Sequence, residues 1–243
     1  MRALVVGGSS GIGLSIVLNL IGRDEYDRVY VLDKSAFPGE YKTEKVLYTC
    51  CDLSLGEYSC LTGMDDIQSL YITAGFGHLK FFQELSEEYI QNSFSVNAIA
   101  PIQIIRHFYD RLLSRDDFFC GVMVSIAGRL SSPLFSVYSA TKAALSKFIE
   151  AINVELDVQG SKNRILEVSP GSMKGTGFTG GVTNPEMTKD LAEEIIRRAI
   201  SHEELYIPQY DSVFRSVIER YETDAHKFGV ESYLYKKKRL ELK

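Results

Sequence analysis

Short apolar runs alternate along the chain with longer segments that carry apolar residues three and four positions apart. The runs have the length of buried strands, and the longer segments have the spacing of helices. The predicted strands are 3–6, 29–32, 46–49, 70–73, 121–125 and 165–168, and the predicted helices are 14–21, 86–113 with a bend at Pro101, and 140–158. Strands and helices that alternate with short connections predict an α/β fold, a doubly wound parallel sheet covered by helices on both faces.

Composition and charge fit one globular domain, residues 1–243. The chain has 45% hydrophobic and 24% charged residues, and a net charge of -5. Its positive charge is concentrated only at 236–239, so nucleic acid is not an expected partner. No apolar run reaches the roughly 20 residues of a membrane span, and no signal peptide is apparent. We therefore expect a cytoplasmic protein without a membrane partner. The four cysteines have no metal-ligand spacing, so we expect free thiols and no metal.

The first predicted strand leads directly into a turn of glycine and serine. Gly7, Gly11 and Gly13 follow the spacing G-x-x-x-G-x-G, which lets the backbone approach a pyrophosphate at the amino end of a helix. Alone, this turn also suits an ordinary flexible loop. Asp33 ends the second predicted strand about twenty residues later, where an acid binds the hydroxyls of an adenosine ribose. Together the two features favour a dinucleotide site.

A second polar group lies between the strand at 121–125 and the helix after it. Ser125 ends the strand, and Tyr138 and Lys142 are four residues apart, so they share one helix face. An ammonium near a phenol favours the phenolate. We therefore expect Lys142 to lower the pKa of Tyr138 from about 10 and to make it a general acid and base. The same pair also occurs by chance on many helices.

Five features in one order resemble the short-chain dehydrogenase/reductase family of NAD(P)-dependent oxidoreductases. They are the glycine turn at 7–13, Asn97, Ser125, Tyr138 and Lys142, and Ser125 lies 13 residues before Tyr138, as in the family. The resemblance implies a Rossmann-like domain. It also implies hydride transfer between a nicotinamide and a small-molecule carbonyl or alcohol substrate.

The resemblance implies a role for each catalytic position. Tyr138 would pass the proton to or from the substrate oxygen, and Ser125 would hydrogen-bond that oxygen. Lys142 would lower the pKa of the tyrosine and bind the nicotinamide ribose. Asn97 would hold a water that links Lys142 to solvent. Taken alone, Asn97 fits better as a polar residue that caps or bends a helix before Pro101.

The implied cofactor contacts follow the carboxyl ends of the strands. They are Gly7, Ser9, Ser10, Gly11, Ile12 and Gly13 in the turn, Asp33 at the ribose, Asp52 and Leu53 near adenine, Ala74 and Gly75, Tyr138 and Lys142, and Pro170, Gly171 and Met173 beside the nicotinamide. Asp52 and the Pro170-Gly171 pair also suit ordinary turns. Because Asp33 would repel a 2′-phosphate and the turn has no Arg or Lys, we predict a preference for NAD(H), with NADP(H) still possible. The charge of Lys34 should make that preference smaller.

The chain departs from the family pattern at several positions. The glycine turn lacks a threonine hydroxyl. Thr73 stands where the family has an asparagine that ties neighbouring strands, so we expect a weaker hydrogen bond there. Thr176 comes one residue late for the nicotinamide amide. The closing strand is shortened to 205–208, and the tail at 228–243 matches nothing in the family.

Two further expectations concern motion and assembly. Residues 171–181 include five glycines in eleven positions, which suits a substrate lid around 172–200, or a permanently disordered loop. Ala140, Ala143 and Ala144 offer small side chains for a homodimer or homotetramer. His78, Ser131, Ser132 and Ser136 are expected to be loop residues.

Two other functions stay open at this point. A redox-sensing NAD(P)-binding protein could use the same fold, but such proteins tend to lose the tyrosine or the lysine. A dehydratase or epimerase would need room for an added substrate domain.

Overall fold

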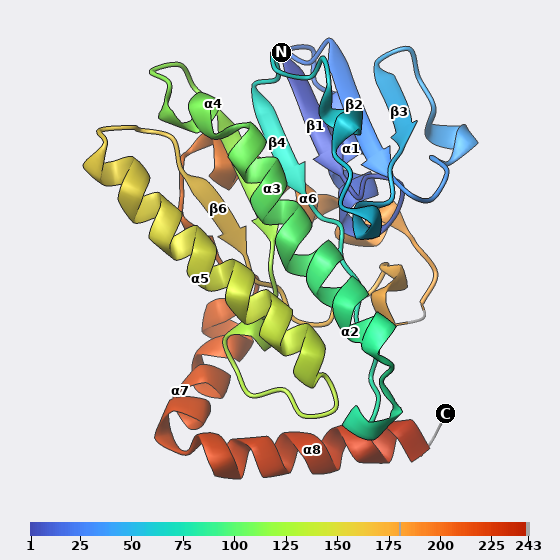
Figure 1. Cartoon of the computed structure of the whole chain (residues 1–243), viewed down its shortest axis with the longest axis vertical. Helices are drawn as coiled ribbons and strands as arrows, with labels where there is room; N and C mark the ends of the chain where they lie inside the picture. The colour runs from blue at the N-terminus through green and yellow to red at the C-terminus, as the bar shows by residue number, and fades with distance from the viewer. Residues whose placement is uncertain (180, 242–243) are drawn as a thin grey trace.

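The computed structural model describes residues 1–179 and 181–241, and these form a seven-stranded parallel sheet (Figure 1). The strands are β1 (Arg2–Val6), β2 (Arg28–Asp33), β3 (Val46–Cys50), β4 (Ser69–Ile72), β5 (Phe119–Met123), β6 (Ile165–Val168) and β7 (Leu205–Tyr206). Their order is β3-β2-β1-β4-β5-β6-β7. The predicted doubly wound parallel sheet is confirmed.

Helices cover both faces because alternate residues of each strand point to opposite sides. The helices are α1 (Gly11–Ile21), α2 (Glu87–Phe94), α3 (Ala100–His107), α4 (Tyr109–Leu113), α5 (Ser136–Val158), α6 (Lys189–Ile200), α7 (Arg215–Thr223) and α8 (Ala225–Glu241). On β1, Leu4 and Val6 join one apolar core and Ala3 and Val5 join the other. The first core packs under α3 and α5, which lie in front of the sheet in Figure 1, and the second packs under α1 and α6.

The strand order reverses at β1, which creates the expected ligand edge. β2 and β3 lie on one side of β1, and β4 to β7 lie on the other. The backbone nitrogens of Gly7 and Ala74 donate to Leu32 and Val6 at 2.7 and 3.0 Å, so the turns after β1 and β4 are in contact. Parallel sheets bind ligands outside the carboxyl ends of the strands at such a reversal.

The predicted helix 86–113 is divided, and its irregularity lies before Pro101 instead of at it. Ser86 caps α2 by accepting from the Tyr89 nitrogen at 3.1 Å, as predicted. A π-helical turn, Ser95–Ile99, then precedes α3. Pro101 has no N–H to offer to the carbonyl of Asn97, four residues earlier, so the missing hydrogen bond is absorbed by a wider turn upstream.

The C-terminal helices form a hairpin beyond the carboxyl ends of the strands. Arg220 of α7 pairs with Glu231 of α8 at 2.5 Å, and the rings of Tyr221 and Phe228 pack edge to face. In Figure 1, α8 lies across the bottom of the molecule, below the loop that enters α5. The unassigned tail is therefore largely helical, with residues 242 and 243 outside the described part.

Among residues 1–179 and 181–241, no helix is long and apolar enough to cross a membrane.

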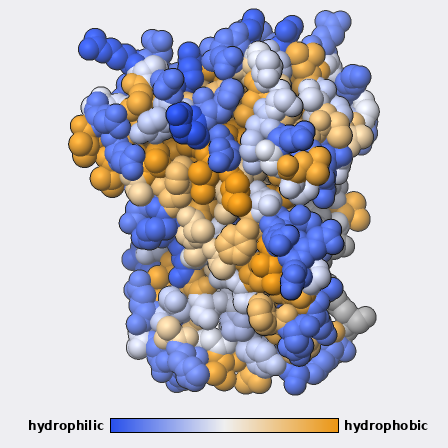
Figure 2. Space-filling view, in the orientation of Figure 1, coloured by the Kyte–Doolittle hydropathy of each residue, from blue (hydrophilic) through white to orange (hydrophobic). Residues whose placement is uncertain are grey.

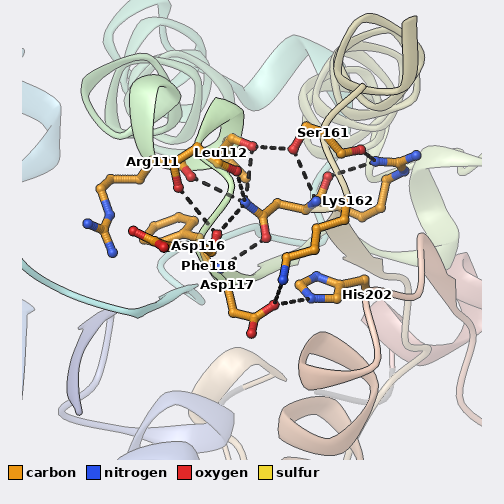
Figure 3. A network of polar contacts seen from close by, with 11 residues as sticks. Arg111, Leu112, Asp116, Asp117, Phe118, Ser161, Lys162 and His202 are labelled. Carbon is orange, nitrogen blue, oxygen red and sulfur yellow. Dashed lines mark hydrogen bonds and ion pairs between the residues drawn. The ribbon is translucent and has the colours of Figure 1, made fainter. Parts of the chain in front are cut away.

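The opposite edge of the sheet is tied together by one buried amide. The Oδ1 of Asn163 accepts from the Phe118 nitrogen at 3.0 Å. Its Nδ2 lies 3.0 to 3.3 Å from four carbonyls of the turn after α4, which belong to Arg111, Leu112, Ser114 and Asp116. Figure 3 shows this network, with Asp117, Lys162 and His202 at its rim. The network fixes the start of β5 and lies at the amino ends of the strands. The carboxyl ends of the strands are free of it.

Candidate active site

The glycine turn accepts no side chain at its first and last glycines. Gly7 has a φ of +83°, and a Cβ there would lie 2.5 Å from the Ala74 nitrogen. A Cβ on Gly13 would lie 2.1 Å from the Gly7 carbonyl oxygen and 2.4 Å from Thr73 Oγ1. Gly11 has a φ of +51° and opens α1. The amino end of α1 therefore lies bare and close to β1, which suits an anion.

Thr73 performs the linking role for which we expected a weaker bond. Its hydroxyl lies 2.9 Å from the Val6 carbonyl oxygen and 3.1 Å from that of Gly7. A threonine hydroxyl thus bridges β4 to the start of the glycine turn. The tie between the strands is therefore kept, and its strength relative to an asparagine stays a prediction.

Asp33 lies at the glycine turn, at the end of β2. One carboxylate oxygen accepts from the Ser9 nitrogen at 3.0 Å, and the other accepts from the Ser35 nitrogen at 2.9 Å. Within the described residues, the buried hydroxyl of Ser9 has no hydrogen-bond partner. A buried hydroxyl beside bare glycine backbone and a carboxylate fits the ribose and phosphate groups of a dinucleotide. Ser10 and Ile12 complete the turn, as the last residue before α1 and its second residue.

Asp52 and Leu53 adjoin the end of β3. Asp52 accepts from the nitrogen and the hydroxyl of Ser54 at 2.9 and 2.7 Å, and these hydrogen bonds hold the pKa of the Asp52 carboxyl below its usual range. Leu53 is buried in the first core. Asp52 therefore caps a short turn, and this structural role is compatible with a place near adenine.

Ser125, Tyr138 and Lys142 converge where β5 meets α5. The Ser125 hydroxyl accepts from the Ala127 nitrogen at 3.1 Å and donates to the Pro170 carbonyl at 3.4 Å. Tyr138 and Lys142 lie in the first two turns of α5 and are only 7% and 2% exposed. The Lys142 ammonium donates to the Met123 carbonyl at 2.8 Å and lies 5.9 Å from the centre of the Tyr138 ring.

Burial, not Lys142, dominates the protonation of Tyr138 in this structure. It raises the pKa of Tyr138 to about 12, and the Ser125 hydroxyl acts in the opposite direction. Burial also lowers the pKa of Lys142 to about 8. The expectation that Lys142 lowers the pKa of Tyr138 is wrong here, because the ammonium is turned to the Met123 carbonyl and both groups are dehydrated.

Asn97 is fully buried and joins the loop after β4 to α5. Its Oδ1 accepts from the Phe76 nitrogen at 2.9 Å, and its Nδ2 donates to the Phe76 carbonyl at 2.8 Å and to Thr141 Oγ1 at 3.2 Å. Both N–H groups of its side-chain amide are therefore engaged. Its backbone carbonyl receives no N–H from Pro101, four residues later.

The loop after β4 presses against the catalytic side chains. A Cβ on Gly75 would lie 3.3 Å from Lys142 Nζ, and a Cβ on Gly77 would lie 2.7 Å from the Tyr138 ring. Gly77 was missed by sequence reasoning, although its Gly-Phe-Gly context, two residues after Gly75, is a usable signal. His78 is exposed, as expected.

Aromatic rings cover Tyr138. Phe135 and Phe178 lie with ring centres 5.6 and 5.1 Å from that of Tyr138, and they stack on each other at 6.4 Å. Phe178 belongs to the predicted lid. Thr176 of the same segment lies 3.6 Å from where a Cβ on Gly11 would be. The segment thus reaches both the tyrosine and the glycine turn, and neither ring carries a local sequence signal.

Pro170, Gly171 and Met173 leave the end of β6 toward the same place. The Pro170 carbonyl accepts from the Ile126 nitrogen at 3.0 Å. A Cβ on Gly171 would lie 2.4 Å from the ring of Phe214, a contact that was not predicted. Met173 packs on the second core. Among residues 1–179 and 181–241, no cluster of His, Cys, Asp or Glu could hold a metal ion.

Comparison with known proteins assigns the family. The family model for short chain dehydrogenases matches residues 1–187. The chain belongs to the short-chain dehydrogenase family. Its relatives include proteins named as oxidoreductases, dehydrogenases and reductases.

Individual short-chain dehydrogenases resemble it at moderate identity. The uncharacterized oxidoreductase TDA5 of Saccharomyces cerevisiae is 28% identical over 186 residues, which cover 73% of this chain and 56% of that protein. The chain thus spans little more than half of that relative. The L-xylulose reductase of Bos taurus is 29% identical over 80% of both chains. A short chain dehydrogenase from Burkholderia cenocepacia, crystallised with NADP, is 18% identical and has a TM-score of 0.74 over 95% of this chain and 96% of its own, which supports the fold.

Proposed function

We propose that this short-chain dehydrogenase transfers hydride between a nicotinamide and the carbonyl or hydroxyl group of a small molecule, as alcohol dehydrogenases and carbonyl reductases do. One observation carries the proposal: Ser125, Tyr138 and Lys142 converge in a buried site at the end of β5. Only β4 separates β5 from β1, which leads into the glycine turn. A hydroxyl, a phenol and an ammonium are the groups needed to hold a carbonyl oxygen and to supply its proton. The bound cofactor would supply the hydride.

Tyr138 would supply the proton. Because its pKa is raised to about 12, the phenol keeps its proton at neutral pH and can donate it to the oxygen of a carbonyl that is being reduced. Ser125 Oγ would hold the same oxygen, since its other contact, the Pro170 carbonyl, is a long 3.4 Å. The aromatic cover would exclude water from this transfer.

Lys142 would bind the nicotinamide ribose and restore the tyrosine proton. Its ammonium has three donors, and the described residues engage one of them, at Met123. The backbone carbonyl of Asn97 receives no N–H from Pro101, and it would hold the water that connects Lys142 to solvent. The redox-sensing alternative is not favoured, because both the tyrosine and the lysine are present and buried together.

Replacing Tyr138 and Lys142 separates their roles. Tyr138→Phe keeps the ring and its packing, so NADH affinity should be unchanged while turnover falls by about 10²- to 10⁴-fold. Lys142→Met should weaken both NADH binding and turnover, because it removes a ribose contact. NADH titration and initial rates on a reducible carbonyl give the two readouts, and thermal unfolding controls for folding.

The same variants test the protonation state. Alcohol oxidation needs the phenol to lose its proton, so its rate should rise with pH from neutrality toward about pH 12, whereas carbonyl reduction should not. Tyr138→Phe should abolish the rise. The mechanism is wrong if this variant stays within a few-fold of the parent on a confirmed substrate.

We propose a preference for NAD(H) over NADP(H). The Asp33 carboxylate accepts a hydrogen bond from the Ser9 nitrogen in the glycine turn. The negative charge of Asp33 therefore lies where a 2′-phosphate would have to fit. Lys34 lies close enough to Asp52 to lower the pKa of that carboxyl, and its charge should reduce the preference. The dissociation constant should be lower for NADH than for NADPH. Asp33→Asn should bring the two dissociation constants closer together. Tighter binding of NADPH to the parent chain would contradict this assignment.

We propose that the segment around 172–200 acts as a lid. Phe178 lies on Tyr138 and Thr176 lies at Gly11, so closure would cover cofactor and substrate together. Residue 180 lies outside the described part. NADH should slow limited proteolysis within 172–184 by a measurable factor, and Phe178→Ala should reduce that protection. Equal cleavage with and without NADH would exclude a lid.

We also propose a homodimer or homotetramer formed through the α3 and α5 face. Figure 2 shows hydrophobic side chains at the surface of this face, and Val154 and Val158 of α5 are 60% and 81% exposed. Such exposed apolar residues on a helix with small neighbours suit a second copy. Sedimentation at micromolar concentration should show the oligomer, and Val154→Lys with Val158→Lys should dissociate it. A parent chain that sediments as a monomer would refute the assembly.

A further inference from the structure

Lys236 of α8 reaches into the loop that connects Ser125 to Tyr138. Its ammonium donates to the Ser132 hydroxyl at 2.6 Å and to the Pro133 carbonyl at 3.2 Å. It also lies 5.8 Å from the centre of the Phe135 ring. The C-terminal helix, which matched no family feature, thus delivers one cation to the loop between two catalytic positions.

The Phe135 ring lies near both that cation and Tyr138. The ring packs against Tyr138 and Phe178. Its edge would also lie 3.2 Å from a Cβ on Gly77. Phe135 is therefore a wall of the site that holds the phenol, and Lys236 is one ring removed from Tyr138.

Among the described residues, the charge of Lys236 has no carboxylate partner. Its contacts are a hydroxyl, a carbonyl and a ring, and the described residues place no carboxylate within ion-pair distance of it. Lys237 and Arg220 differ, since they pair with Glu241 and Glu231, whereas Lys238 and Arg239 of α8 resemble Lys236 in having no ion pair among the described residues. The half-buried position also lowers the pKa of Lys236 to about 8, because dehydration disfavours the ammonium.

A purely structural tie between α8 and the loop would not need this charge. A neutral donor could bind the same hydroxyl and carbonyl without the cost of dehydrating an ammonium. The ammonium has a third N–H beyond its two protein acceptors. An anion supplied by the substrate would satisfy both the charge and the remaining donor.

We propose that Lys236 binds an anionic group of the substrate, a carboxylate or a phosphate, while the reacting carbonyl or alcohol lies at Ser125 and Tyr138. This assignment rests on the proposed function and narrows its substrate class to oxo or hydroxy compounds that carry a negative charge. Lysine acts as a point charge without a planar fork, so it suits either anion.

Matched pairs of substrates test the assignment. Pyruvate, acetoacetate and levulinate place the carboxylate at increasing distance from the carbonyl, and each is compared with its methyl ester. Dihydroxyacetone phosphate is compared with dihydroxyacetone. The parent chain should prefer the charged member of at least one pair. Lys236→Met should lower kcat/KM for that member by about ten-fold or more, mainly through KM, and should leave the neutral member within a few-fold.

Two further variants control for structure. Lys236→Arg keeps the charge and should retain most of the preference. Lys237→Met removes a neighbouring charge that is already paired, and should change neither substrate. Equal losses on charged and neutral members, or no preference in the parent, would overturn the role of Lys236 while leaving the reductase activity in place.

Binding separates this outcome from failure of the proposed function. With NADH present, each anion of the panel is titrated against parent and Lys236→Met by thermal shift. If no compound is reduced but an anion binds the parent and not the variant, the anion site stands and the proposed reaction fails. If no anion is reduced, and none binds Lys236→Met more weakly than it binds the parent, the proposed anion site is wrong.

Discussion

The burial of the Lys142 ammonium constrains the whole carboxyl edge of the sheet. A charge that is 2% exposed needs a partner, and the Met123 carbonyl at the end of β5 provides one at 2.8 Å. This contact fixes the start of α5 against β5. The loop after β4 must then pass so close to Nζ that Gly75 has little space for a side chain. Asn97 holds that loop from the other side through the Phe76 backbone. One dehydrated charge thus determines how three connections meet.

Much of the fold followed from local pattern because each signal has a local cause. Alternating apolar runs bury both faces of a parallel sheet, and the glycine turn follows from a close approach that excludes a Cβ at Gly7 and Gly13. Pro101 shows where such reasoning ends. Its missing N–H predicts a disturbed helix, but the pattern does not say which turn widens. Packing against α5 and the β4 loop places the π-helical turn at Ser95–Ile99.

The rest of the site could not be predicted because its parts meet across long sequence separations. Phe178 and Phe214 belong to segments far along the chain from Tyr138 and Gly171, which they respectively cover. Phe135 is only three residues from Tyr138, but nothing in its neighbours marks it as part of this cover. The protonation of Tyr138 has the same origin. A spacing of four residues shows that Lys142 can approach the phenol. In the fold, burial raises the pKa of Tyr138, and the Lys142 ammonium donates to the Met123 carbonyl.

The residues around the candidate active site come from both sides of the point where the family match ends. The match ends at residue 187, and the residues before it hold the glycine turn, Ser125, Tyr138 and Lys142. Residues after it supply Phe214 against Gly171 and Lys236 at the 132–135 loop. These later contacts reach the residues around Tyr138 through a glycine, a backbone carbonyl and the ring of Phe135. If Lys236 holds a substrate anion as we propose, a substitution on α8 would change substrate binding without moving Ser125, Tyr138 or Lys142.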